Sequence, residues 1–164
     1  MQTCPDSSAP QYFDMDVESC TAPQCVMAAW QDMVDPFYPL CQARVMQSDI
    51  RAIVAASSHA LVTGTKVAGL YDQSADRHLR IAAEARGQHL QGVDGDRGVK
   101  FGGTLPELTE TGAGGSIYME IGDGSARGFD RTTSSHFTCR SDDDVVQLYD
   151  HSVSAWFNYR VQTV

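Results

Sequence analysis

The sequence lacks the features that mark secretion and membrane insertion. None of its apolar runs approaches the roughly 20 residues that a transmembrane helix needs. The first fourteen residues contain no lysine or arginine and no long apolar stretch, whereas a secretory signal has a basic start followed by an apolar segment. We therefore expect a cytoplasmic protein with no membrane partner.

Cysteine and histidine are present, but never at the spacing of a metal site. The cysteines are odd in number and form no Cys-x-x-Cys pair: Cys4, Cys20, Cys25, Cys41 and Cys139. The five histidines include no His-x-His or His-Glu-x-x-His pattern. Zinc sites need paired ligands at short spacing, so we expect no metal and no cofactor. In a reducing cytoplasm the cysteines are expected to be free thiols.

Basic residues are scarce. The chain has 12 basic and 21 acidic residues, which give a formal net charge of −9. Arg77, Arg80 and Arg86 fall close together, but Asp76 and Glu84 lie among them. Binding to a phosphate backbone requires a basic stripe or patch. Direct nucleic-acid binding by this chain alone is therefore not expected.

What is present is the composition of a globular domain. Apolar residues make up 42% and charged residues 20% of the chain, which is ordinary for a folded protein. We expect a polar lead-in over residues 1–20 and one domain over residues 21–164. A helix is predicted over residues 22–34, because Thr21 is a good N-cap, apolar side chains follow at helical spacing, and the Asp35-Pro36 step ends the pattern.

The middle of the chain predicts short strands. Residues 60–71 are rich in β-favouring side chains, and residues 116–121 alternate apolar with polar side chains. Glycines separate short runs over residues 92–115, as in turns between antiparallel strands. Residues 49–58 fit either a short helix or a strand, and no internal repeat is apparent.

A second helix is predicted at the C-terminal end. Ser141 is a good cap, and the three aspartates of residues 142–144 would occupy the first turn, where the helix dipole favours anions. An apolar stripe at helical spacing follows: Val145, Tyr149, Val153 and Trp156. We expect this amphipathic helix to form a homodimer interface. The order helix, strands, helix indicates an α+β fold built on an antiparallel β-rich barrel or sandwich.

No catalytic residue is assigned from the sequence. There is no Gly-x-Ser-x-Gly nucleophile motif, and the glycine-rich segment over residues 112–116 lacks the lysine that follows a phosphate-binding loop. Cys139 and His136 are near each other in sequence, but residues three apart on a strand point to opposite faces. These features favour a sensing or binding module over a stand-alone enzyme.

Three segments resemble a known family. Residues 30–40, 76–91 and 114–121 are similar to the opening helix and strand, a strand–loop–strand segment, and a turn-and-strand of the cupin-like N-terminal ligand-sensing domain of AraC/XylS-type transcriptional regulators. The family's usual Arg-Thr pair is Arg77-His78 here, and no pair of helix-turn-helix units follows. The resemblance implies a small-molecule effector pocket inside a barrel and dimerisation through a helix.

The leading hypothesis is a small-molecule effector-binding domain of a transcriptional regulator, without its own DNA-binding region. The candidate ligand-binding residues combine polar and aromatic side chains: Arg77, His89, Tyr71, Tyr118 and Trp30. For Arg77 the alternative role is a surface salt bridge, and for His89 a structural imidazole. Two other hypotheses stay open: a cupin-like or barrel-fold enzyme of the isomerase or cyclase type acting on a small organic substrate, and an interaction module whose terminal helix docks a partner.

Overall fold

A computed structural model describes residues 45–112 and 114–164. The predicted helix over residues 22–34, the lead-in over residues 1–20 and the candidate residue Trp30 lie outside the described residues.

One α-helix, α1 (Ser48–Thr63), forms from the segment whose pattern fitted both a helix and a strand. Apart from Asp49, Arg51 and His59 its residues are apolar or small, and every residue from Ala52 to Ala60 is buried. A helix that is apolar all round belongs in a protein interior. It ends at Gly64, which has a positive φ of 70° and donates its N–H to the carbonyl of Ala60 at 3.0 Å. Within the described part of the chain, no helix has the length and hydropathy to cross a membrane.

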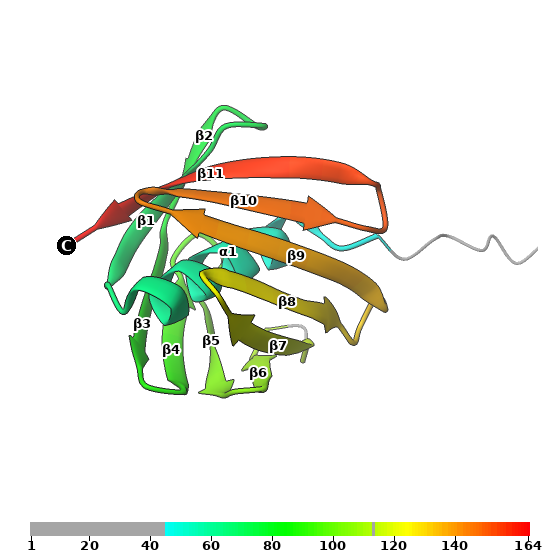
Figure 1. The fold of residues 1–164 in the computed structure, drawn as a ribbon, viewed down its shortest axis with the longest axis horizontal. Coiled ribbons are helices and arrows are strands. Elements are labelled where there is room, and N and C mark those ends of the chain that lie inside the picture. Colours follow the sequence, from blue (N-terminus) through cyan, green and yellow to red (C-terminus); the bar gives the residue numbers. More distant parts are fainter. Residues whose placement is uncertain (1–44, 113) are drawn as a thin grey trace, which may run out of the picture. The chain divides into compact units, whose positions relative to one another are not determined.

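The strands form one antiparallel sheet that closes on itself around α1 (Figure 1). The sheet order is β11-β10-β9-β8-β7-β6-β5-β4-β3-β1-β2, and β11 also pairs with β1. Only Arg80 separates β2 from β3, so the two form one bent strand. Counted in this way, the barrel has ten strands. The expected β-rich antiparallel barrel is thus confirmed. The strands are β1 (Val67–Asp72), β2 (Arg77–Leu79), β3 (Ile81–Arg86), β4 (His89–Asp94), β5 (Val99–Thr104), β6 (Glu107–Glu110), β7 (Ser116–Gly122), β8 (Ser125–Asp130), β9 (Ser135–Asp142), β10 (Val145–Asp150) and β11 (Ala155–Thr163).

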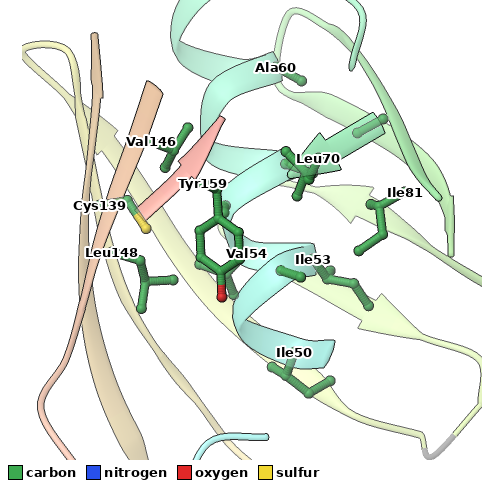
Figure 2. Close-up of a cluster of buried hydrophobic side chains, with 14 of the residues drawn as sticks. Ile50, Ile53, Val54, Ala60, Leu70, Ile81, Cys139, Val146, Leu148 and Tyr159 are labelled. Carbon is green, nitrogen blue, oxygen red and sulfur yellow. The ribbon is translucent and has the colours of Figure 1, made fainter. Parts of the chain in front are cut away.

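The interior of the barrel is filled by α1 and by the inward side chains of the strands. The helix packs against β1, β3, β4 and β7 to β11. Figure 2 shows Ile53 and Val54 of α1 among Leu70, Val146 and Leu148 of the surrounding strands. All five side chains are at most 1% exposed. The space in which a cupin-like sensor would hold its effector is therefore occupied by the protein's own helix.

Five successive hairpins repeat one design. In each, the first strand ends in a buried carboxylate, and the fourth residue after it has a positive φ. The carboxylates are Asp72, Asp94, Glu110, Asp130 and Asp150; the residues with positive φ are Asp76, Gly98, Gly114, Ser134 and Ser154. In the four aspartate turns, the carboxylate accepts the backbone N–H two residues further on. This hydrogen bond from the backbone to the side chain takes the place of the backbone hydrogen bond that closes an ordinary turn.

The same hairpins share an inward pair of residues. The residue two before each carboxylate lies opposite the residue seven after it: Leu70 and Leu79, Gly92 and Phe101, Leu108 and Ile117, Gly128 and Phe137, Leu148 and Phe157. In the sequence, only the carboxylate and the two positions of the inward pair recur. Successive carboxylates are 22, 16, 20 and 20 residues apart (94−72, 110−94, 130−110 and 150−130). The five hairpins thus share a register that few residue types mark, so the sequence alone shows no internal repeat.

The predicted C-terminal helix is also wrong. The segment after Ser141 is the end of β9, a tight turn, β10 and β11. The aspartates expected in a first helical turn instead form the β9–β10 turn, where Asp143 has a φ of 46°. The stripe assigned to helical dimerisation is divided among β10, the following turn and β11: Val145, Tyr149, Val153 and Trp156. Between them, Val146 and Leu148 point inward at 0% exposure, which is the two-residue period of a strand.

Candidate functional site: an outer aromatic groove

The residues predicted to bind a ligand lie at separate places on the barrel. Tyr71 and Arg77 belong to the β1–β2 hairpin, His89 begins β4 next to a two-residue turn at the opposite end of the barrel, and Tyr118 lies in the middle of β7. Arg77 makes no ion pair with a described residue, and His89 is exposed with its Nδ1 3.3 Å from Thr104 Oγ1. The structure therefore does not bring the candidates together in one pocket.

Tyr118 is instead part of a row of side chains that crosses neighbouring strands on the outer face. Glu107, Tyr118, Phe129 and His136 stand opposite one another in the registers of β6, β7, β8 and β9. His151 extends this row, because its backbone N–H donates to the carbonyl of His136 at 3.0 Å. The ring centroids of Tyr118 and Phe129 are 5.8 Å apart, and those of Phe129 and His136 are 5.5 Å apart. Such offset ring pairs are attractive.

A second row of outward side chains runs parallel to the first, two residues away from it along each strand. It consists of Glu120, Arg127, Thr138, Tyr149 and Trp156, which stand opposite one another on β7 to β11. The rings of Tyr149 and Trp156 are 5.0 Å apart, and Trp156 is 51% exposed. The second row thus begins with polar and charged groups and ends with two aromatic side chains.

A groove of about 400 Å³ lies between the two rows, and we call it the outer groove. Its lining combines aromatic and polar side chains: Tyr118, Glu120, Arg127, Phe129, His136, Thr138 and His151. Neighbouring strands are roughly 4.8 Å apart, so a groove that crosses from β7 to the end of β10 extends over roughly 14 Å. That is enough length for an elongated ligand lying across the strands.

Hydrogen bonds and ion pairs hold the aromatic wall of the outer groove. The Tyr118 hydroxyl donates to Glu120 Oε1 at 2.5 Å, and this hydrogen bond raises the pKa of the phenol, which therefore stays protonated. The Arg131 guanidinium lies 5.2 Å from the ring centroid of Phe129 and 5.9 Å from that of Tyr118. Arg131 also donates a hydrogen bond to Glu107, and this bond lowers the pKa of the Glu107 carboxyl. The wall is thus arranged before any ligand arrives.

The nucleophilic and basic groups that could suggest catalysis are kept apart. Cys139 points into the core at 0% exposure, while His136, three residues earlier, is exposed on the outer face. Burial raises the pKa of the Cys139 thiol to about 12, so it stays protonated at neutral pH. His59, on α1, is also buried, and burial lowers its pKa. Among residues 45–112 and 114–164, no group of three or more histidine, cysteine or acidic side chains is placed to hold a metal ion.

The carboxylates at the hairpin ends have a structural use. Arg97 forms ion pairs with Asp94 at 2.7 Å, with Glu110 at 2.9 Å and with Asp49 in the first turn of α1. Arg51 of α1 likewise pairs with Asp150 at 3.2 Å. These contacts connect the start of the helix to the rim of the barrel through three of the five carboxylates, and the other two, Asp72 and Asp130, accept hydrogen bonds within their turns.

Sequence reasoning found one residue of the outer groove and missed most of the others. Tyr118 was a candidate, whereas Phe129, His136, Thr138 and His151 were not. A signal was present: an aromatic residue directly precedes three of the turn carboxylates, in Tyr71-Asp72, Phe129-Asp130 and Tyr149-Asp150. An aromatic ring or imidazole follows six residues after each of these carboxylates, namely His78, His136 and Trp156. Only the register shows that these pairs face outward together.

Comparisons with known proteins add no relative to this picture. No protein-family model matches the chain, and neither a curated protein nor a solved structure was found to be similar to it.

Proposed function

We propose that this barrel is a binding module that recognises a neutral oligosaccharide in the outer groove. The observation that carries the proposal is the alignment of two cross-strand rows, one mostly aromatic and one beginning with polar groups, on either side of a single groove.

The chemistry of a sugar chain matches both walls. The C–H faces of a sugar ring pack on aromatic rings, as Tyr118 and Phe129 provide, because aromatic side chains offer large apolar surface with a polar edge. Sugar hydroxyls both donate and accept hydrogen bonds. Thr138 and Arg127 stand across the groove from these rings, and His151 ends the aromatic row. Binding sites are generally apolar surfaces with a few polar groups that fix orientation. The outer groove has this composition.

Stacking of nucleic-acid bases would use the same rings but is opposed by charge. Single-stranded nucleic acids need a positively charged groove beside the stacking rings. The chain carries a net charge of −9. Of the two arginines nearest the rings, Arg131 is paired with Glu107, and Arg127 Nε lies 3.9 Å from Glu120 Oε2. A neutral ligand avoids the repulsion that a phosphate backbone would meet here.

The resemblance to AraC/XylS-type sensor domains implies recognition of a small ligand inside the barrel. Here we place the ligand on the outer face of the barrel. α1 fills the barrel interior, so the ligand is placed on the outer face. A role in transcription regulation rests on that resemblance alone.

Isothermal titration calorimetry and protein-observed NMR against soluble cello-, xylo-, malto- and chito-oligosaccharides test the proposal. We expect saturable binding with shifts at Thr138 and His151, and an affinity loss of about fivefold or more for Phe129→Ala, because removing an aromatic ring on which the ligand packs costs about 1 kcal/mol or more. Tyr71→Ala is the matched control, since Tyr71 also lies on the outer face and packs on a histidine at 4.9 Å, outside the groove. Absence of binding by every sugar, or equal losses in both variants, would contradict the proposal.

A further inference from the structure

A second hollow, of about 460 Å³, lies on a different part of the outer face, over β3, β4 and β5. Its lining includes Lys66, Ala82, Glu84, Gln91, Gly92, Val93 and Lys100. It shares no lining residue with the outer groove. We call it the lysine hollow.

The lysine hollow contains both lysines of the 164-residue sequence. Lys66 directly precedes Val67, which stands opposite Ala83 of β3, and Lys100 stands opposite Val93 on the far side of β4. The two side chains therefore approach the hollow from opposite sides. Both are exposed, and neither forms an ion pair within the described ranges 45–112 and 114–164.

The floor between the lysines is apolar and shallow. Ala82 and Val93 stand opposite each other and face outward, and Val93 is 40% exposed. Next to Val93, Gly92 faces inward, where a Cβ would lie 2.3 Å from the ring of Phe101, so only its backbone lines the hollow. Small side chains thus leave a hydrocarbon-lined depression that water covers at a cost when no ligand is present.

The one carboxylate of the lysine hollow is already engaged. Glu84 accepts hydrogen bonds from Arg86 at 3.0 and 3.2 Å, and these bonds hold the pKa of the Glu84 carboxyl below its usual value. Arg86 therefore offsets the charge of Glu84 locally. Lys66 also acts on the Glu84 carboxyl electrostatically, but neither lysine forms an ion pair with a described residue.

We infer that the lysine hollow binds a small organic anion with an apolar body, such as a medium-chain carboxylate. The anionic group is held by Lys66 and Lys100, whose flexible stems let the ammonium groups turn toward it. The hydrocarbon covers Ala82 and Val93, where burial of apolar surface favours binding. This site is independent of the outer groove and of the sugar proposed for it.

Calorimetric titration with hexanoate, octanoate and decanoate, each beside its uncharged primary amide, tests this inference. We expect affinity to rise with chain length and the amides to bind about tenfold more weakly, because charge-assisted hydrogen bonds are the stronger ones. Lys66→Gln and Lys100→Gln should each weaken octanoate binding by about tenfold. Arg140→Gln is the control, since Arg140 is an exposed cation on β9, on the opposite side of the barrel.

Acetylation with acetic anhydride, followed by mass spectrometry, gives a second measurement on the same protein. Bound decanoate should slow the acetylation of both lysines, and Phe129→Ala should leave this protection unchanged. No saturable binding, equal affinity for acid and amide, or octanoate binding that survives both lysine substitutions would overturn the inference. None of these outcomes depends on sugar binding, so the two proposals fail separately.

Discussion

At the scale of single residues, the barrel separates chemistry by the face on which a side chain lies. Cys139 and His136 are close in sequence, yet one points to the core and the other to solvent. The strand period alone predicted this separation correctly. The same alternation produces the outer groove, because every second residue of β7, β8 and β9 shares the outer face.

The buried thiol makes a prediction at this scale. Because burial raises the pKa of Cys139 to about 12, the folded protein has almost no thiolate there at neutral pH. In a variant with serine at the other four cysteines, we expect a disulfide reagent of the Ellman type to react with Cys139 only after denaturant is added. The absorbance of the released thiol reports the reaction. Rapid reaction of the native protein at pH 7.5 would contradict this account.

At the scale of elements, each of the five hairpins has one inward pair, and in two of them a glycine stands opposite a phenylalanine. Gly92 faces Phe101, and Gly128 faces Phe137, whereas two of the other three hairpins place Leu opposite Leu or Ile. In a densely packed interior, a phenylalanine opposite a glycine leaves no spare room for a larger side chain at the glycine.

Adding one methyl group to such a pair should therefore destabilise the barrel. In Gly92→Ala the new Cβ would lie 2.3 Å from the Phe101 ring and 2.7 Å from the carbonyl oxygen of Ala82. We expect a loss of about 1–3 kcal/mol in the free energy of unfolding, measured by urea denaturation. Gly122→Ala is the matched control, because nothing lies within 4 Å of a Cβ there. Equal stability of the two variants would show that the pair is not tightly packed.

The elements also show what the sequence can and cannot predict. The antiparallel barrel was predictable, because glycine-rich turns and alternation recur along the chain. The C-terminal helix was wrong because Val145 and Tyr149 fit a helical stripe while Val146 and Leu148 fit a strand, and only pairing with β9 and β11 decides between them. The outer groove needed cross-strand register, which no local pattern contains.

At the scale of the whole molecule, the fold is a barrel built around its own helix. Arg97 connects Asp49 of α1 to two carboxylates of the rim, so the helix and the sheet are expected to unfold together. Polar groups enclosed with the helix then affect the stability of the entire domain. His59 is such a group, because it is 1% exposed and its Nδ1 has no hydrogen-bond partner among the described residues.

The stability of the domain should accordingly depend on pH through His59. Burial lowers its pKa below the ordinary 6.5, so between these two values the unfolded chain binds a proton that the folded chain does not. Stability should therefore be complete above pH 6.5 and fall as the pH drops below it. Urea denaturation of wild type and His59→Gln between pH 5 and 8 measures this: the variant should have the flatter curve. His89→Gln controls for the loss of an exposed imidazole and should keep the wild-type slope. If His59→Gln loses stability in parallel with wild type below pH 6.5, the buried imidazole is not the group responsible.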